Sequence, residues 1–278
     1  MGLQGYRQMI HPDSLAIDLT SVREPATAYV MMSRVQVLMQ LFILDIFLSC
    51  KLYPSPSAME ELKRLQQIAR NEDEKKRKDS SLLSSMNIRS LTHHHQNLIK
   101  DPMICGQVIA IQETWCNPQQ ENLHLQFPGY EVFLVSQGQG KGIATFYKDN
   151  FKTNGLINKP LYQISRVSNE KVDIINVYLS RGANKKEFLH DLGSLARGAR
   201  KVIIAGDFNI DYLKNPNDIV IKTIISCGFQ QMVSSPTHEK GGLLDHIYIK
   251  NIASQVDVTM YFPFYTDHAA VSIAVNDL

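Results

Sequence analysis

Polar side chains capable of metal and phosphate chemistry stand at the ends of several short apolar runs. The clearest case is VIIAGDFN at 202–209, in which an apolar run and a glycine are followed by Asp207 and Asn209. A lone aspartate at such a place would be an ordinary turn residue. The same pattern recurs at other runs, however, and draws on a narrow set of residue types. The set consists of Asn87, Glu113, Tyr178, Asp207, Asn209, Asp245, His246, Asp267 and His268.

These residue types suit the hydrolysis of a phosphoester. Carboxylate and amide oxygens are preferred by a hard divalent cation such as Mg²⁺, which takes one or two carboxylates and keeps several waters. A histidine near an aspartate can act as an acid or as a cation that stabilises an oxyanion. Together these groups favour a reaction in which water attacks a phosphodiester while a metal and an imidazole hold the developing charge.

Rigid elements must hold these side chains, and the sequence predicts a β-rich framework for them. Short β-type runs such as QVIAIQ, VDIINVYL and KVIIAG recur along the C-terminal two thirds of the chain. Two segments have the apolar spacing of helices, 185–200 and 218–229, and Gly228 closes the second. Many strands with few helices between them predict two packed sheets flanked by helices.

The composition is that of an ordinary soluble protein, with 44% hydrophobic and 20% charged residues and a net charge of +2. This small net charge does not predict a polyanionic partner. Binding of nucleic acid would therefore depend on local clusters of basic residues. The four cysteines contain no CxxC pair and are typical of reduced thiols in an intracellular protein. Arg34, Gln36, Gln40 and Asp45 interrupt the most apolar stretch, 29–50, so we expect no membrane span.

A charged segment, NEDEKKRKDSS at 71–81, divides the chain. It is entirely polar and has no hydrophobic period, which predicts a linker or an exposed turn. The division leaves an N-terminal part at 1–70 and a larger part at 82–278. KKRK at 75–78 matches a nuclear localisation signal, which would make the protein nuclear, and a solvated linker is the alternative interpretation.

The larger part resembles the endonuclease/exonuclease/phosphatase superfamily. The motifs MNIRSL, IQETW, NVY, GDFN, LLDHIY and TDH occur in the order of that superfamily, and GGLLDHIYI and TDHAAV are most similar to the endonuclease domains of mobile elements. The resemblance implies an α/β (α+β) fold, a four-layered α/β/β/α sandwich of two packed mixed sheets. It also implies Mg²⁺ as the cofactor, with Mn²⁺ as an alternative, and DNA as the partner. The segment at 147–172 is short for the superfamily, so we expect a reduced edge strand.

The resemblance implies a metal and phosphate site. Glu113 matches the principal metal ligand of the superfamily, and Asn87 matches a residue beside it in the same site. Asp267 matches a second carboxylate near the metal. Thr266, which precedes it, replaces a more usual serine.

The resemblance also implies roles for five catalytic residues. Asp207 matches the residue that orients and deprotonates the attacking water, and Asn209 matches a donor to a phosphate oxygen. His268 matches the imidazole that contacts the scissile phosphate, and Asp245 matches the carboxylate that orients it. Tyr178 matches a phenol that contacts the phosphate or stabilises the leaving group.

Other polar residues near these motifs have two interpretations. His238 could reach a phosphate or be a turn residue, and Trp115 could stack on a base or be structural. We expect His246 to pack in the core or cap an element, and the histidines at 93–95 to form an exposed loop near a substrate groove. The glycines at 138–142 predict a hairpin turn, because the segment lacks the first and last residues that a P-loop requires.

Basic residues in the larger part could form a rim for a nucleic-acid duplex. The alternative is that they are ordinary solvated side chains. The residues concerned are Lys141, Lys148, Lys152, Lys159 and Arg166.

The N-terminal part carries a second resemblance, to the C-terminal end of a RecD/Pif-type superfamily-1B DNA helicase. It rests on ATAYVMMSRVQVLMQLFILD and SPSAMEELKRL, and implies a small α/β appendage. Arg34 matches the arginine that reaches the γ-phosphate of ATP, but no Walker segment precedes it, so we expect no ATP site. A helix predicted at 57–70 has an apolar face that would contact the nuclease domain or a helicase core. Joined helicase and nuclease segments are similar to Helentron-type transposons, which predicts that the chain is a fragment of such a protein.

The sequence leaves three functions open. The first is a Mg²⁺-dependent DNA endonuclease of transposon origin. The second is a phosphatase or an RNA nuclease of the same superfamily, because the chemistry is shared and surface loops select the substrate. The third is a catalytically silent remnant that binds nucleic acid, and the intact set of catalytic residue types argues against it.

Overall fold

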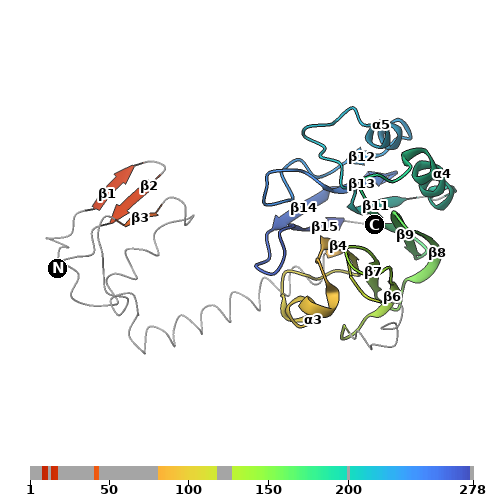
Figure 1. The fold of residues 1–278 in the computed structure, drawn as a ribbon, viewed down its shortest axis with the longest axis horizontal. Coiled ribbons are helices and arrows are strands. Elements are labelled where there is room, and N and C mark those ends of the chain that lie inside the picture. Colours follow the sequence, from red (N-terminus) through yellow and green to blue (C-terminus); the bar gives the residue numbers. More distant parts are fainter. Residues whose placement is uncertain are drawn as a thin grey trace. The chain divides into compact units, whose positions relative to one another are not determined.

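Two six-stranded sheets hold the polar strand ends described above (Figure 1). The computed structural model describes residues 8–11, 14–17, 41–43, 81–117, 127–198 and 201–275. The chain divides into two units, Met1–Asp73 and Glu74–Leu278, and both six-stranded sheets belong to the second unit.

Strands from both ends of the second unit combine in its first sheet. Its strands are β4 (Ser81–Asn87), β5 (Val108–Gln112), β6 (Glu131–Val135), β7 (Ile143–Tyr147), β14 (Val256–Tyr261) and β15 (Ala270–Val275). The other sheet is built from the middle of the sequence. Its strands are β8 (Lys152–Lys159), β9 (Tyr162–Ser168), β10 (Asp173–Leu179), β11 (Val202–Asp207), β12 (Gln230–Gln231) and β13 (Asp245–Lys250). The described helices are α3 (Leu91–Lys100), α4 (Lys185–Ala196) and α5 (Ile219–Ser226).

The strand directions bring the polar strand ends to one edge of each sheet. The first sheet has the order β14-β15-β4-β5-β7-β6, and the second has the order β12-β13-β11-β10-β9-β8. Because β4 and β5 are parallel, Asn87 and Glu113 leave their strands at the same end, and antiparallel β15 brings His268 there. In the second sheet β13 is antiparallel to β11, so Asp245 lies opposite Asp207.

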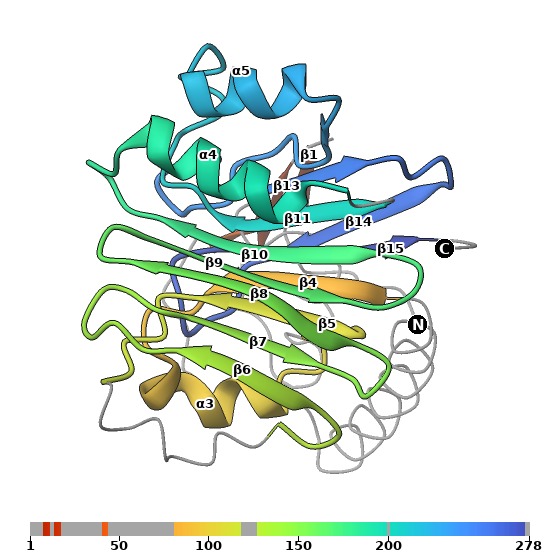
Figure 2. The ribbon, with the colours of Figure 1, turned by 90° about the vertical axis from the view of Figure 1, so that its right-hand side faces the viewer.

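Alternation along the strands creates the layers of the fold. In β11, Ile203 and Ala205 belong to the core between the sheets, whereas Val202 and Ile204 pack with residues of α4 and α5. The outer face of the first sheet packs in the same way against α3. The layers are therefore helix, sheet, sheet and helices, which confirms the predicted four-layered α/β/β/α sandwich (Figure 2).

Both helices predicted from apolar spacing are present, and each begins at a capping side chain. Asn184 accepts hydrogen bonds from the backbone N–H groups of Lys186 and Glu187 at the start of α4. Asp218 accepts one from the backbone N–H of Val220 at the start of α5. These caps satisfy amide groups of the first turn that have no partner within the helix.

Two expectations about local structure are wrong. The histidines at 93–95 lie in α3 and not in a loop, because Ser90 accepts a hydrogen bond from the backbone N–H of His93 and starts a helix that buries Leu91 and Leu98. The expected reduced edge strand is β8, which spans eight residues and pairs with β9. An edge strand exposes most of its side chains, so β8 carries no apolar run that would reveal its length.

The N-terminal unit contains a three-stranded sheet in its described residues. In this sheet β1 (Gln8–His11) is antiparallel to β2 (Ser14–Ile17), and β3 (Leu41–Ile43) is parallel to β2. Arg34, the helix predicted at 57–70 and all but the last residue of the charged segment at 71–81 lie outside the described residues. Within the described ranges, no helix is long and apolar enough to cross a membrane.

Buried amides and hydroxyls tie the two large sheets together. Asn176 of β10 accepts a hydrogen bond from Nε2 of Gln112 on β5 at 2.8 Å, and donates to Oγ1 of Thr145 on β7 at 3.0 Å. The hydroxyl groups of Thr145 and Ser165 lie 2.8 Å apart and link β7 to β9. Because a buried amide without a partner is costly, these pairs restrict how the sheets can sit on each other.

Gly206 allows the backbones of β10 and β11 to approach closely just before Asp207. Its φ is 145°, and a Cβ at this position would lie 1.9 Å from the carbonyl oxygen of Val177. Both the dihedral angle and the contact exclude a side chain. The glycine in GDFN is therefore required by the packing of the strand that carries Asp207.

We expect the substitution Gly206→Ala to lower the free energy of unfolding by about 3 kcal/mol, because the methyl group must displace backbone. The measurement is urea unfolding of the full chain. Gly193→Ala is the matched control, since Gly193 is exposed in α4 with nothing within 4 Å of a Cβ. That variant should gain up to about 1 kcal/mol. Equal stabilities of the two variants would contradict the close approach at Gly206.

Candidate active site

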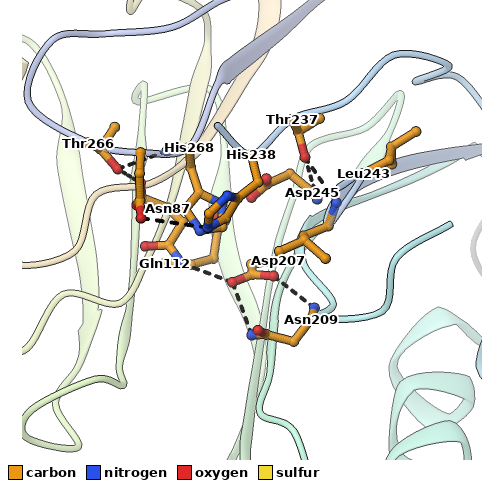
Figure 3. Close-up of polar contacts among 12 residues, drawn as sticks. Asn87, Gln112, Asp207, Asn209, Thr237, His238, Leu243, Asp245, Thr266 and His268 are labelled. Carbon is orange, nitrogen blue, oxygen red and sulfur yellow. Dashed lines mark hydrogen bonds and ion pairs between the residues drawn. The ribbon is translucent and has the colours of Figure 1, made fainter. Parts of the chain in front are cut away.

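The carboxylate of Asp207 is fully buried at the end of β11 and is surrounded by amide donors (Figure 3). Its Oδ2 accepts hydrogen bonds from Nδ2 of Asn87 at 2.9 Å and Nδ2 of Asn209 at 3.1 Å. Its Oδ1 accepts one from the backbone N–H of Asn209 at 2.8 Å. Burial and then the charge of Asp245 raise the pKa of Asp207, while His268 and the amide donors act in the opposite direction. The result is an oriented carboxylate that can accept a proton.

A second buried carboxylate holds an imidazole beside Asp207. Nδ1 of His268 lies 2.9 Å from Oδ2 of Asp245. Burial disfavours the imidazolium, but the carboxylates of Asp245, Asp207 and Asp267 outweigh it and raise the pKa of His268 to about 9. His268 is therefore cationic at neutral pH and donates to Asp245. Ligand atoms of Asp207, Asp245 and His268 lie within 4.8 Å of one another.

Two aromatic side chains lie against the carboxylate of Glu113, which follows β5, and Trp115 donates to it. Nε1 of Trp115 donates to Oε2 at 3.1 Å, and the hydroxyl of Tyr178 lies 3.5 Å from Oε1. The same hydroxyl donates to the carbonyl oxygen of Gly140 at 2.8 Å. Burial raises the pKa of Tyr178, and the carboxylates of Glu113 and Asp207 raise it further, so the phenol keeps its proton. Tyr178 thus stands between Glu113 and the Asp207 strand end.

Asp267 is held by two cationic or polar neighbours. Its Oδ2 forms an ion pair with Arg89 and lies 3.6 Å from Nε2 of His238. Nδ1 of His238 accepts a hydrogen bond from the backbone N–H of Lys240 at 3.1 Å, so Nε2 carries the proton that faces Asp267. The rings of His238 and His268 pack edge to face with centroids 4.7 Å apart. Two imidazoles therefore flank this carboxylate.

Two threonines fix the segments that carry the imidazole and its partner. Oγ1 of Thr266 donates to the carbonyl oxygen of Asn87 at 2.8 Å and lies 3.3 Å from the backbone nitrogen of His268. Oγ1 of Thr237 lies 3.0 Å from the backbone nitrogen of Asp245. Because threonine and serine share the hydroxyl group, Thr266 keeps the contacts that a serine could make.

Left-handed backbone follows three strands at the ends that carry the site, and Asn251, after the far end of β13, is the other non-glycine case in the described residues. A positive φ is unusual for residues other than glycine and costs about 1 kcal/mol or more. Such angles occur directly after β4, β5 and β11. The residues are Arg89 (49°), Ser90 (104°), Glu113 (52°), Trp115 (55°) and Asn209 (50°). This concentration of strain is typical of a functional site, where the fold fixes the directions of side chains.

The sequence matches the model of the endonuclease/exonuclease/phosphatase family over residues 62–268. The chain belongs to this family. No curated protein matches the sequence.

Solved structures with the same fold include three enzymes or enzyme domains. The 3′–5′ exonuclease NExo from Neisseria meningitidis is 19% identical, with a TM-score of 0.56 over 70% of this chain and 99% of its own. An AP endonuclease from Archaeoglobus fulgidus is 17% identical, with a TM-score of 0.55 over 70% and 99%. The endonuclease domain of TRAS1, a telomere-specific non-LTR retrotransposon, is 14% identical, with a TM-score of 0.51 over 69% and 96%. At these identities the likeness concerns the fold.

The fold of the endonuclease/exonuclease/phosphatase family brings all the predicted site residues to the same edges of the two sheets. Each is linked to another by a side-chain contact or by direct pairing of neighbouring strands. They are Asn87, Glu113, Tyr178, Asp207, Asn209, Asp245, Asp267 and His268. The individual chemical roles assigned to them stay predictions.

Two further residues belong to the site. His238 had two interpretations in the sequence, and the structure places it against Asp267 and His268. Arg89 was not identified, although it stands two residues after Asn87 in MNIRSL. Its place in that motif was the available signal, but only the fold shows that it meets Asp267 from the far end of the chain.

Two of the five basic residues considered for a rim have structural partners, and the rim formed by Lys141, Lys148 and Lys152 stays a prediction. Arg166 donates to Asp173 and to the carbonyl oxygen of Leu195, so it ties strand to helix, and Lys159 pairs with Glu187. Other basic side chains gather around a hollow of about 400 Å³ beside Asn209 and His238. They are Arg181, Lys185, Lys214 and Lys240. Lys185 and Lys214 pair with aspartates, whereas Arg181 and Lys240 are exposed.

The residues of this family site fit a divalent cation. In the part of the chain that the structure describes, Oδ1 of Asp267 and Oδ1 of Asp245 are buried without a hydrogen-bond partner. A buried carboxylate oxygen without a partner is costly unless a ligand satisfies it. Asn87 and Glu113 add the oxygen donors that hard cations prefer.

His246, which follows Asp245, belongs to the core, as expected. Its ring stacks on Phe208 with centroids 4.8 Å apart, and Nε2 lies 2.9 Å from the carbonyl oxygen of Ile210. Nε2 therefore carries the proton, and Nδ1 accepts from the hydroxyl of Tyr248 at 2.9 Å. Burial lowers the pKa of His246 from 6.5 to about 4.

This depressed pKa predicts a loss of stability in acid. Between pH 6.5 and about 4 the unfolded chain binds a proton at His246 that the folded chain does not bind. The free energy of unfolding should therefore fall as pH falls, with a contribution of about 1.4 kcal/mol per pH unit. Urea unfolding of the full chain at several pH values would measure the slope, and His246→Gln should reduce it. An unchanged slope in the variant would contradict the neutral, buried state of this histidine.

Proposed function

We propose that the protein is a Mg²⁺-dependent DNA endonuclease of transposon origin that hydrolyses phosphodiester bonds. The observation that supports this most directly is the meeting of Asp207, Asp245 and His268 within 4.8 Å. Water attack on a phosphate requires a group that takes the proton and a group that stabilises the negative charge on the phosphate. An oriented buried carboxylate beside a carboxylate-held imidazolium supplies both.

In this proposal Asp207 orients and deprotonates the attacking water. Asn87 and Asn209 hold its carboxylate in place, and the side chain of Asn209 also donates to a phosphate oxygen. Because Asp245 engages Nδ1 of His268, Nε2 is the imidazole atom that can donate to the phosphate. Tyr178 keeps its proton and donates to the phosphate or to the leaving group.

Glu113, Asn87 and Asp267 would hold the divalent cation. When bound, the ion supplies a Lewis acid that polarises a phosphate oxygen. The donor atoms are oxygens, which favours Mg²⁺, with Mn²⁺ as the alternative. Arg89 and His238 hold Asp267 in position.

Two observations favour DNA as the substrate. The hollow beside Asn209 is lined by four basic side chains and by Asp211 and Asp218, and its excess of positive charge suits the phosphates of a nucleic-acid strand. In addition, the Neisseria relative, at 19% identity and a TM-score of 0.57, has a structure bound to a product DNA hairpin. The likeness to the TRAS1 endonuclease domain supports the transposon origin.

Removal of a 3′ phosphate from DNA is the second candidate. The structure of the Neisseria relative with the hairpin describes that protein as a 3′ phosphatase. Hydrolysis of a terminal phosphate would use the same water, carboxylate and imidazole. The helicase origin of the N-terminal part rests on residues of which only 41–43 are described, and the nuclear signal lies outside the described ranges, so both stay predictions.

The test of the main proposal is cleavage of supercoiled plasmid and of an abasic-site duplex by the full chain. With Mg²⁺ we expect nicking of at least one of these DNAs, and EDTA should abolish it. Asp207→Asn should lower the rate by about 100-fold or more, because it removes the proton acceptor but keeps the side-chain volume. Glu113→Gln should raise the Mg²⁺ concentration needed for half-maximal activity.

The matched control for both variants is Asp149→Asn, since Asp149 is exposed in the turn before β8. It should cleave like the unchanged chain. A 3′-phosphorylated DNA strand in the same assay measures the phosphatase alternative. Metal-independent nicking, or nicking that survives Asp207→Asn, would contradict the proposed mechanism.

A further inference from the structure

An exposed aromatic ring stands next to the candidate active site. Phe264 exposes 90% of its surface, whereas the next most exposed large apolar side chain of the described residues, Leu213, exposes 48%. The ring contributes almost nothing to the core in this position. It stands two residues before Thr266, whose hydroxyl is tied to the end of β4.

The loop that carries Phe264 is clamped on both sides. The hydroxyl groups of Tyr261 and Tyr265 both donate to Oδ2 of Asp101, the residue that ends α3. One carboxylate thus fixes the loop against α3, and the two elements lie side by side (Figure 1). A ring on a clamped loop loses little freedom when it binds a ligand.

The ring begins a row of aromatic side chains that runs onto α3. Phe264 lies 5.2 Å from Tyr265, Tyr265 lies 5.9 Å from His94, and His94 lies 4.8 Å from His93, between ring centroids. Phe264 and His93 are exposed at the two ends of the row. The row thus offers aromatic surface at two points beside one edge of the active site.

We propose that Phe264 is a stacking surface for an unpaired base of the nucleic-acid substrate, next to the phosphate that is cleaved. The inference rests on the proposed function and names the form of substrate, a single-stranded or locally opened segment. Aromatic side chains stack on bases of any sequence, because every base has a π-face. The phosphate next to a stacked base would lie toward Asp267 and His268, which follow the ring in the chain.

Protein partners are the competing occupants of this surface. Val258, Met260 and Phe262 are also exposed on β14 and its end, but only to 36%, 36% and 46%. Phe264 stands out by its clamp and by its connection to the catalytic segment. A single rigid ring adjoining a phosphate-binding site matches a base better than it matches a broad apolar interface.

The experiment measures binding of a short fluorescent single strand of DNA to the full chain in EDTA, by anisotropy. We expect Phe264→Ala to weaken binding by about 5- to 100-fold, the effect of losing one stacked base. Phe264→Trp should keep the affinity, because it keeps a π-face, whereas Phe264→Leu should lose it although it stays apolar. The ring is exposed, so these variants should unfold at the temperature of the unchanged chain.

A strand of the same length with abasic sugars in place of all nucleotides is the decisive control. It keeps the phosphates but has no bases, so Phe264→Ala should not change its binding. Equal losses on both strands, or no loss on either, would overturn the proposal. A dimer of the unchanged chain that Phe264→Ala dissociates would assign the ring to a second copy and overturn it as well.

Hydrolysis of the phosphodiesters of this abasic-sugar strand with Mg²⁺ separates the inference from the proposed function. That ester has no base and no other aromatic ring, so Phe264→Ala should hydrolyse it at the unchanged rate. Retained ester hydrolysis with DNA binding that does not depend on Phe264 would overturn the stacking proposal alone. Failure of the unchanged chain to bind DNA would also overturn the stacking proposal. Failure to hydrolyse the ester with Mg²⁺ would, separately, contradict the proposed phosphoesterase function.

Discussion

A carboxylate without access to water must find its hydrogen-bond donors within the protein, and Asp207 finds them in both sheets. Asn87 ends a strand of the first sheet, stands 120 positions away in the sequence, and donates at 2.9 Å. That bond can form only if the sheets pack in one relative position. The amide pair of Gln112 and Asn176 and the close approach at Gly206 serve the same alignment. These buried polar contacts form a polar seam between the sheets, and this seam sets the positions of the other site residues.

The side chains around this seam carry more negative than positive charge. Asp207, Asp245 and Asp267 gather around His268, and Arg89 adds a second positive charge. Glu113 contributes a further carboxylate, whose neighbours Trp115 and Tyr178 are both neutral. Such an excess of acidic groups is costly for a folded protein, and both a bound cation and protonation relieve it. The stability of the fold and the chemistry of the site thus depend on the same acidic groups.

Much of the fold and most of the candidate site could be predicted, because both rest on local patterns. Apolar runs ending in polar residues marked β11 and β13, and helical spacing marked α4 and α5. Prediction failed where a polar contact, which the apolar pattern does not record, decides the structure. The histidine at 93 joins a helix through the cap at Ser90, and Arg166 pairs with Asp173 on a neighbouring strand. No local pattern reveals that Arg89 meets Asp267.

The strand order also constrains how the chain can be made. In the first sheet β15 lies between β14 and β4, so one edge of β4 has no partner until the last strand of the domain has been synthesised. A ribosome-bound chain that ends before residue 268 therefore carries an open, apolar strand edge and an incomplete site. Unpaired edges are prone to non-native association, and pairings between distant segments form slowly. Translation of this domain thus includes a long interval in which protection by a chaperone would be useful, and during which the candidate site is not yet assembled.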